Sequence, residues 1–319
     1  MGCANKRVRP KVTSHVNRNF ESLLQRHLVS VVRDIPPPWR PKDRGRRPHP
    51  PRTVAICCML MVALGKTYDS IEAYLRVNEH LKGLLHTDSL PGHSVIHRGM
   101  TSMPLPYVRR VLRKTVWRLR RNGMTVAVDA SGMSTTNRSV WFDIRIGRKS
   151  SRKDFIKLHI AVDVETGIIH RFEMTPWNGS DLAQFERLMG GLPDIAAALG
   201  DKAYSSRRNC EIVAQKGGKA YLLFKSNATA RARMQPEWQR SFREFTRDRE
   251  GWMAVYHLRS IVEGVFSSLK RSWGSALRSR KHWNQRKELA LKVLAYDVRQ
   301  VLYNQRAEEL GVDLRSEVH

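Results

Sequence analysis

Cysteine is scarce in this sequence, and its spacing excludes two classes of small domain. The four cysteines include no CxxC pair and no set spaced like a disulfide framework. A structural zinc site and a disulfide-stapled secreted domain are therefore not expected. Cys57 and Cys58 lie inside an apolar run, and we interpret them as buried thiols of a protein in a reducing compartment. A glycine-rich phosphate loop is also missing.

Long apolar runs are missing as well. The longest, from Val54 to Leu64, is about half of the roughly 20 residues that cross a bilayer, so we interpret it as a buried helix. The N-terminal stretch MGCANKRVRPK has no apolar segment of the secretory kind, and Lys6 stands where an acylation signal has Ser or Thr. We expect no membrane partner.

Acidic residues are few: 29 Asp and Glu stand against 57 Lys and Arg, which gives a net charge of +28 in 319 residues. An excess of this size attracts a polyanion and makes the binding depend on salt concentration. Nucleic acid is therefore the first candidate partner. With 41% hydrophobic residues, the chain can also bury the core of one large domain or two smaller ones.

The first part of the chain is basic. Residues 1–52 combine a modest helical pattern with a proline-rich segment at 35–52, which we interpret as an extended basic linker. In residues 53–122 apolar positions recur at helical spacing around a turn at Pro91–Ser94. This pattern predicts a helical domain, either a DNA-binding helix-turn-helix unit or plain scaffolding.

A helix at about 106–121 carries a strongly cationic face. Arg109 and Arg113 lie on this face, opposite the valines and leucines of the same helix. Such a face is commonly only solvated, but at this net charge we favour contact with DNA.

From residue 123 the pattern changes to strands. Alternating or β-branched runs, followed by helices, occur at 125–128, 139–146, 155–164, 167–175, 196–199 and 220–225. Antiparallel strands followed by alternating strands and helices predict an α/β fold with a mixed sheet flanked by helices. The predicted domain spans 123–305 with an irregular insertion at about 227–252, and a polar tail covers 306–319.

Two acids follow predicted strands. Asp129 ends the run at 125–128, and Asp201 follows the run at 196–199. Acids at strand ends point into the crevice at the sheet edge, although either residue alone is more often a turn or helix cap. Three further acids, Asp143, Asp163 and Asp181, are assigned to strand edges or caps.

A predicted helix at about 253–273 supplies a third acid. Tyr256, Arg259, Glu263 and Lys270 are spaced by three, four and seven residues, which places them on one stripe opposite an apolar face. Surface ion pairing is the simpler explanation of such a stripe. Three carboxylates that converge would instead suit two Mg²⁺ or Mn²⁺ ions, which activate an attacking oxygen and stabilise a leaving one.

Together these residues resemble a known family. The spacing Tyr256-x2-Arg259-x3-Glu263-x6-Lys270 is similar to the Y-R-E-K signature of DDE transposases from bacterial and archaeal insertion sequences. The resemblance also includes Val126–Gly132, Trp141–Asp143, Lys157–His159, Gly200–Tyr204 and Phe224–Asn227.

The resemblance implies a ribonuclease-H-like domain in which Asp129, Asp201 and Glu263 bind two Mg²⁺ or Mn²⁺ ions. It also implies that Arg259 and Lys270 hold the DNA backbone while Tyr256 contacts a phosphate or base. The partners would be double-stranded terminal repeats and target DNA, bridged by a homodimer in the prokaryotic cytoplasm at the nucleoid. The reaction would cleave element ends and join their 3′ hydroxyls to the target.

Two alternatives stay open: a catalytically inactive DNA-binding regulator derived from a transposase, and a nuclease of the same fold that does not join strands. Two residues depart from the family pattern. Trp177 stands where relatives usually have glycine, and Gly264 interrupts a predicted helix. Two explanations for Gly264 stay open: DNA approaches the helix closely there, or the sequence has drifted in a decaying element. Trp238 and Trp252 either stack on a flipped base or pack locally.

Overall fold

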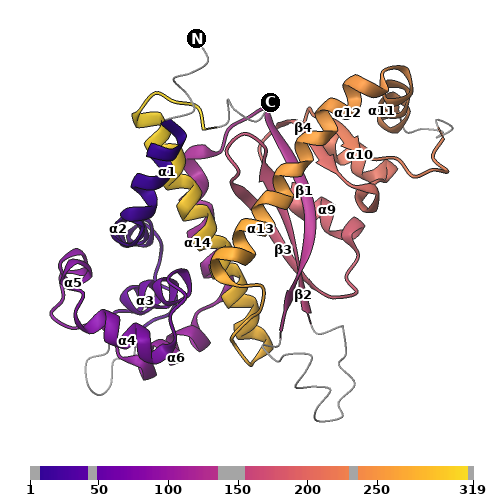
Figure 1. Cartoon of the computed structure of the whole chain (residues 1–319). Coiled ribbons are helices and arrows are strands. Elements are labelled where there is room, and N and C mark those ends of the chain that lie inside the picture. Colours follow the sequence, from indigo (N-terminus) through magenta and orange to yellow (C-terminus); the bar gives the residue numbers. More distant parts are fainter. Residues whose placement is uncertain (1–7, 42–48, 136–154, 230–235, 315–319) are drawn as a thin grey trace, which may run out of the picture. The chain divides into compact units, whose positions relative to one another are not determined.

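The computed structural model describes residues 8–41, 49–135, 155–229 and 236–314 (Figure 1). By its contacts the chain divides into a helical unit, Met1–Trp117 with Ser279–His319, and a sheet unit, Arg118–Arg278. The predicted boundary at 122 lies near this division. Residues 279–305, which the sequence pattern placed with the sheet, group with the N-terminal helices instead.

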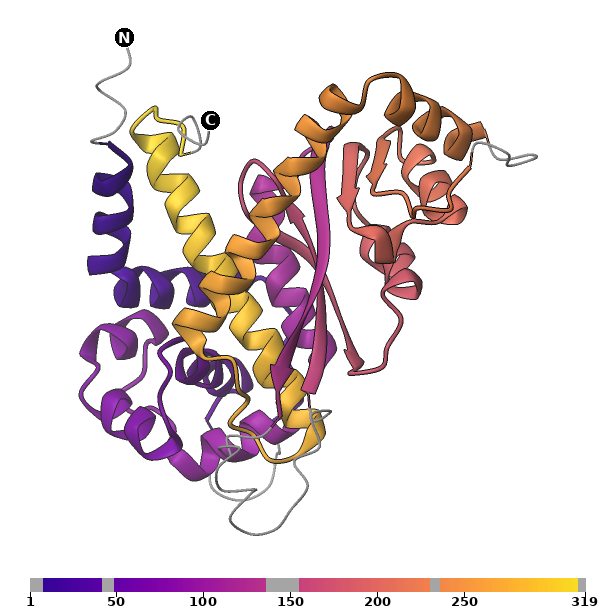
Figure 2. The ribbon, with the colours of Figure 1, turned by 45° about the vertical axis from the view of Figure 1, so that its right-hand side comes forward.

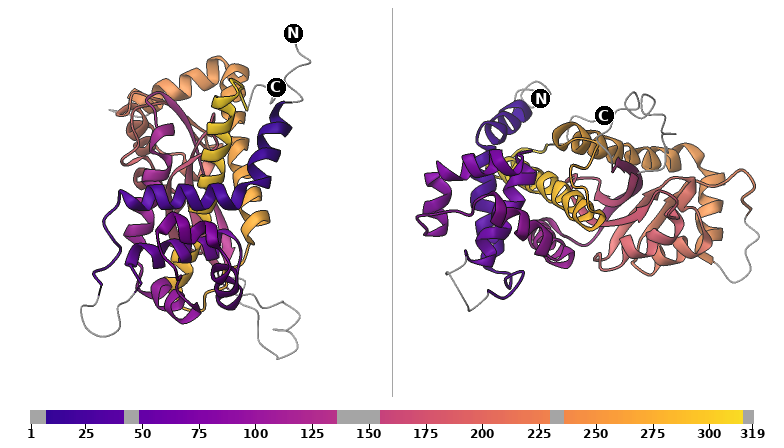
Figure 3. Two further views of the ribbon diagram at one scale, coloured as in Figure 1. Left: turned by 90° about the vertical axis from the view of Figure 1, so that its left-hand side faces the viewer. Right: turned by 90° about the horizontal axis from the view of Figure 1, so that it is seen from below.

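The helical unit is built around one long helix. Its elements are α1 (Val8–Arg18), α2 (Phe20–Arg33), α3 (Pro51–Ala63), α4 (Tyr68–Arg76), α5 (Glu79–Leu85), α6 (His93–Ser102), α7 (Leu105–Val116) and α14 (His282–Glu309). Helix α14 packs against α1, α2, α3 and α7. Figure 3 shows α14, in yellow, among the indigo and purple helices of the helical unit. The predicted helices at 53–65, 69–77 and 106–121 are therefore present, the last with an earlier end.

Helices α3 and α4 begin where the sequence signals a start. Pro51 is the first residue of α3, where its missing N–H is not needed. Thr67 and Ser70 form a reciprocal capping box at the start of α4. Helix α3 is buried along almost its whole length, including both adjacent cysteines. Among the described residues no single helix has the length and hydropathy of a membrane span; only α3 and α4 counted together, with a 116° bend between them, reach both.

The sheet unit contains a five-stranded mixed sheet (Figure 2). Its strands are β1 (Met124–Ser134), β2 (Phe155–Asp163), β3 (Ile169–Pro176), β4 (Ile195–Gly200) and β5 (Lys219–Leu222). They lie in the order β3-β2-β1-β4-β5. Strand β2 is antiparallel to both β1 and β3, whereas β4 is parallel to β1 and β5 is parallel to β4. The predicted fold class, a ribonuclease-H-like mixed sheet flanked by helices, is confirmed.

The two faces of β1 have different partners because successive side chains point to opposite sides of a strand. Val126 and Val128 are fully buried in a core with residues of α9 (Asp181–Met189) and α10 (Arg207–Ala214). Asp129 and Ser131 point to the other side, toward the C-terminal part of the unit. Figure 2 shows α13 (Ile261–Trp273) running along β1 on that side.

Three predictions of local structure are wrong. Strand β1 continues to Ser134, so Asp129 lies inside a strand rather than at its end. The region predicted as irregular contains α11 (Pro236–Arg247) and the first turn of α12 (Arg249–His257), because Trp238, Phe242 and Phe245 recur at helical spacing and pack on the core. The single helix at 253–273 is divided into α12 and α13 by a 3-10 turn, η4 (Leu258–Ser260). The predicted strand at 139–146 lies outside the described residues.

Candidate active site

Asp129 lies where β1 loses one of its two neighbours. The parallel pairing with β4 ends at Ala127, whereas the antiparallel pairing with β2 continues to Ser134. The Asp129 side chain is 22% exposed. Its Oδ1 accepts a hydrogen bond from the backbone N–H of Ala130 at 2.7 Å, and its Oδ2 accepts one from Arg259 at 2.8 Å. Asp129 is therefore beside the end of β4 rather than at the end of its own strand.

Asp201 follows β4 directly, as predicted. Its Oδ1 accepts the backbone N–H of Ala203 at 2.9 Å and caps a short 3-10 helix, so the cap role that the sequence left open is real. The two acids are also close enough to interact. Burial raises the pKa of Asp129, the Asp201 charge raises it further, and Ala130 and Arg259 act in the opposite direction.

Gly200, between β4 and Asp201, is required by close packing. A Cβ at this position would lie 2.9 Å from Leu222 and 3.1 Å from Val128. Any larger residue would push β5 or β1 away, or displace the turn that carries Asp201. Close packing therefore explains why glycine precedes Asp201 in the sequence.

Arg259 connects Asp129 with Glu263. Its Nη1 donates to Asp129, and its Nη2 donates to the Glu263 Oε1 at 3.1 Å, four residues along the chain. Glu263 is 66% exposed, whereas Arg259 is only 18% exposed. At the other end of α13, the Lys270 Nζ donates to the Ser131 hydroxyl at 2.7 Å. The predicted stripe thus lies along β1, with Arg259 and Lys270 each engaging a β1 side chain.

The three carboxylates have the chemistry of a divalent metal site but not yet its geometry. Asp129, Asp201 and Glu263 offer hard oxygen ligands, which suit Mg²⁺ and Mn²⁺. In the described part of the chain, however, no group of three His, Cys, Asp or Glu residues is arranged to hold an ion. Arg259 occupies the position between two of the carboxylates, so metal ligation by all three requires this bridge to open.

Tyr256 lies mostly inside the protein. It is 9% exposed, and its ring stacks on Trp252 with centroids 5.6 Å apart. The Arg259 guanidinium lies 5.9 Å from the centre of the same ring. A contact with DNA, which the family resemblance implied, stays a prediction for this residue.

The other aromatic residues singled out in the sequence differ in burial. Trp238 and Trp252 are both buried in the core of the sheet unit, which confirms the interpretation as local packing. Trp177 is 41% exposed. A Cβ on Gly264 would meet no atom within 4 Å, so nothing in the described chain requires glycine there.

A polar network that the sequence did not reveal lies beside the carboxylates. Asp181, predicted as a cap, pairs with Lys157 at 2.6 Å and with His159 at 3.3 Å. His159 also hydrogen-bonds Thr175 at 2.8 Å, and burial lowers the pKa of His159 to about 4. The packing of α9 on β2 brings Asp181 to Lys157 and His159, and the pairing of β2 with β3 brings Thr175 to His159. No local spacing in the sequence marks these contacts. Asp163 caps the β2–β3 turn as predicted, and Asp143 lies outside the described residues.

Tyr204 is affected by the charges of both this network and the carboxylates. Its side chain is almost fully buried, and its hydroxyl finds no hydrogen-bond partner among the described residues. Burial raises the pKa of Tyr204, and the charges of Asp181, Asp129 and Asp201 add to the rise. The phenol of Tyr204 therefore stays protonated.

The predicted cationic helix is confirmed as amphipathic in the helical unit. On α7 the apolar residues Val108, Val111 and Leu112 are buried, Arg113 is exposed, and Arg109 is partly exposed. Farther along the run, two cations have partners in the sheet unit: Arg120 donates to the carbonyl of Gly191, and Arg121 pairs with Glu165. These two arginines are therefore tied to the protein itself.

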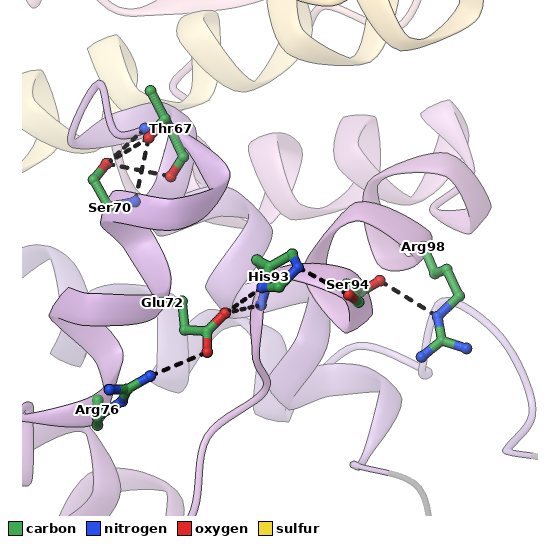
Figure 4. Close-up of polar contacts among 7 residues, drawn as sticks. All are labelled: Thr67, Ser70, Glu72, Arg76, His93, Ser94 and Arg98. Carbon is green, nitrogen blue, oxygen red and sulfur yellow. Dashed lines mark hydrogen bonds and ion pairs between the residues drawn. The ribbon is translucent and has the colours of Figure 1, made fainter.

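A second polar cluster ties two helices of the helical unit together (Figure 4). Glu72 of α4 accepts the backbone N–H of His93 at 2.8 Å, contacts its ring, and pairs with Arg76. His93 is the first residue of α6, so a carboxylate already covers the start of that helix. The turn at Pro91–Ser94 is therefore held on α4, and a DNA phosphate at this helix start would meet a negative charge.

The strand order and the placement of the acids define a ribonuclease-H-like domain with carboxylates on β1, after β4 and on a C-terminal helix. Residues 121–298 match the family model described as "Transposase DDE domain". Because the match covers more than half of the chain, the protein belongs to this family.

One curated relative is similar over part of the chain. It is a probable transposase for insertion sequence element ISA1214 from Archaeoglobus fulgidus, 27% identical over 167 residues, which cover 51% of this chain and 48% of the relative. The chain thus spans about half the length of the curated relative that it matches. No solved structure matches the chain.

Proposed function

We propose that this protein is a DNA transposase that cleaves the ends of an insertion sequence and joins the 3′ hydroxyl to target DNA by two-metal-ion phosphoryl transfer. The observation that carries the proposal is that Arg259 bridges Asp129 and Glu263, while Asp201 lies near enough to Asp129 for its charge to raise the Asp129 pKa. In a member of the DDE family, acids so placed suit divalent metal ions, and the neighbouring cation suits the negative charge of a phosphate group.

Asp129, Asp201 and Glu263 would hold two Mg²⁺ or Mn²⁺ ions per site. Such ions activate the attacking oxygen and stabilise the leaving oxygen of a phosphodiester. Arg259 and Lys270 neutralise the DNA backbone near the cut, and the hydrogen bond to Ser131 keeps Lys270 in place. Tyr256 completes the DNA contacts on this side, through the small part of its side chain that is exposed.

The partner is double-stranded DNA, first the element's terminal repeats and then the target. Arg109 and Arg113 on α7 supply further backbone contacts, in keeping with the net charge of +28. A homodimer would bridge two element ends in the complex. We place the protein in the prokaryotic cytoplasm, at the nucleoid.

A strand-transfer assay tests the proposal. Full-length protein, Mg²⁺ and DNA ending in the element's terminal repeats are incubated with a target plasmid, beside the variants Asp129→Ala and Glu263→Ala. Glu186→Gln, which changes an exposed acid of α9, is the matched control. Joined products are expected with the wild-type protein and the control alone.

Three outcomes would contradict parts of the proposal. Strand joining by the Glu263→Ala variant at the wild-type rate would remove Glu263 from the site. Wild-type protein that binds the ends without cutting them would be a regulator. Wild-type protein that cuts without joining would be a nuclease.

A further inference from the structure

Three aromatic rings of the sheet unit form a column that ends at Arg259. Phe245 of α11 meets Trp252 of α12 edge to face at 4.9 Å, and Trp252 stacks on Tyr256 at 5.6 Å with the ring planes 16° apart. The guanidinium of Arg259 lies 5.9 Å from the centre of the Tyr256 ring. Trp252 is only 4% exposed, so the column is anchored in the core.

Arg259 has contacts on both of its sides. Tyr256 lies on one side, and the carboxylates of Asp129 and Glu263 lie on the other. Burial alone would lower the pKa of Arg259, but Tyr256 and the two carboxylates raise it on balance, so the guanidinium stays charged. The planar guanidinium of Arg259 has N–H donors in two directions, so it can pair with Asp129 and Glu263 at the same time.

The bridge opposes metal binding. Two carboxylates that face each other repel, and a cation between them relieves the repulsion. Arg259 supplies that cation from within the chain, at the place where a divalent ion ligated by both acids would have to lie. A guanidinium that DNA phosphates draw away would leave both carboxylates to other cations.

We propose that Trp252, acting through Tyr256, is a positioning residue that holds Arg259 between Asp129 and Glu263, where Arg259 competes with divalent ions until DNA is bound. This inference rests on the proposed function only in naming DNA as the event that releases Arg259. The column itself, the ion pairs and the competition for the carboxylates belong to the protein without DNA.

The test compares Trp252→Leu, Trp252→Phe and Tyr256→Phe with wild-type full-length protein. Trp238→Phe is the matched control, because Trp238 is buried in the same core and packs on Phe224 at 5.0 Å. Mn²⁺ affinity is measured by calorimetry without DNA, the Arg259 side-chain ¹⁵N signals by NMR, and folding by thermal unfolding.

We expect Trp252→Leu to bind Mn²⁺ about threefold to fivefold more tightly than wild type, the ratio expected when a weak competing ion pair is lost. Its Arg259 signals should shift toward those of a solvated arginine. Trp252→Phe, which keeps a ring in the column, should stay near wild type. Tyr256→Phe keeps its ring but loses the hydroxyl that hydrogen-bonds Arg259, so its Mn²⁺ affinity should lie between those of wild type and Trp252→Leu. The Trp238→Phe control should lose thermal stability with no change in Mn²⁺ affinity.

A purely structural role for Trp252 would weaken Mn²⁺ binding together with stability, so tighter binding separates positioning from packing. Unchanged Arg259 signals and unchanged or weaker Mn²⁺ binding in Trp252→Leu would overturn the inference. If that variant does not fold, unchanged signals and affinity in Tyr256→Phe would overturn it instead. Wild-type protein that binds Mn²⁺ but joins no strands would count against the proposed function alone, since these measurements use no DNA.

Discussion

Arg259 and Asp129, which are 130 positions apart in the chain, form an ion pair of 2.8 Å. This contact brings the turn between α12 and α13 onto β1. The Nη2 of Arg259 also donates to Glu263, so one side chain connects two of the three acids expected to bind metal. In the protein without DNA, Arg259 thus offsets part of the negative charge of these acids.

Lys270 is expected to contribute one charge to DNA binding. Replacing it with Gln should lower DNA affinity and reduce the slope of log affinity against log salt by about one, as for the loss of one phosphate contact. The slope is measured by fluorescence anisotropy at several salt concentrations. Lys219→Gln, at an exposed lysine of β5, is the control. An unchanged slope in the Lys270 variant would place its ammonium away from phosphate.

His159 should make the sheet unit sensitive to acid. Its pKa of about 4 lies below the ordinary value of 6.5, so the folded protein holds this histidine neutral while the unfolded chain protonates it. The stabilisation is complete above pH 6.5 and is lost as the pH falls toward 4, by roughly 2 kcal/mol once solvent access is considered. His159→Gln should flatten that part of the stability profile, measured by denaturant unfolding at several pH values.

His27 serves as the comparison for that experiment. It belongs to the helical unit, and burial lowers its pKa to about 4 as well. A His27→Gln variant should therefore remove the part of the pH dependence of stability that is due to His27. The part that is due to His159 should stay unchanged. Equal profiles for wild type and His159→Gln would show that His159 is not held neutral.

Glu72 should stabilise the helical unit at neutral pH. Hydrogen bonds from the backbone and the ring of His93 lower the pKa of Glu72. A lowered acid pKa stabilises the fold above the unfolded pKa, and this stabilisation is lost as the pH falls through the folded value. Glu72→Gln should lower the unfolding midpoint at pH 7 by about 1–3 °C and have no effect in strong acid.

Glu79→Gln is the matched control for Glu72→Gln. Glu79 is the first residue of α5, and among the described residues it pairs with Lys82 of the same helix alone. Its replacement should leave the midpoint almost unchanged at every pH. A midpoint of Glu72→Gln that equals wild type at pH 7 would mean that the contact with α6 does not stabilise the unit.

Gly264→Ala should stabilise the protein. The added Cβ meets no atom within 4 Å, and alanine in a helix interior is favoured by about 0.5–1 kcal/mol over glycine. Gly83→Ala in α5 is a matched control, since its Cβ also meets nothing. Thermal unfolding and DNA affinity are measured for both. A loss of DNA affinity in Gly264→Ala alone would mean that glycine is needed for DNA to approach the helix closely. Equal affinities in both variants would instead favour sequence drift as the reason for glycine at this position.

Much of the fold was readable from local patterns. Apolar periodicity located α3, α4 and α7 and all five strands of the described sheet, because burial on one face leaves a repeat in the sequence. Helix α11 was missed because its apolar face is made of widely spaced aromatic residues among many charges. The break at η4 was missed because a 3-10 turn changes the helical phase by only a fraction of a turn.

The candidate site was readable in part. The spacing of Tyr256, Arg259, Glu263 and Lys270 was sufficient to identify the family, because a signature on one helical segment is local. The position of Asp129 inside β1 was not readable, since it depends on β2 pairing farther along β1 than β4 does. Pairing partners are distant in the sequence and leave no mark at the strand itself.

By itself, the sequence determined the family, the charge that favours DNA, and the three acids with their accompanying cations. The tertiary structure decided how those groups meet. It placed Arg259 between Asp129 and Glu263, stacked Tyr256 on Trp252, and joined Asp181 to Lys157 and His159. The physical reason is that residue identity and local spacing are properties of the chain, whereas burial and ion pairing depend on which distant segments pack together.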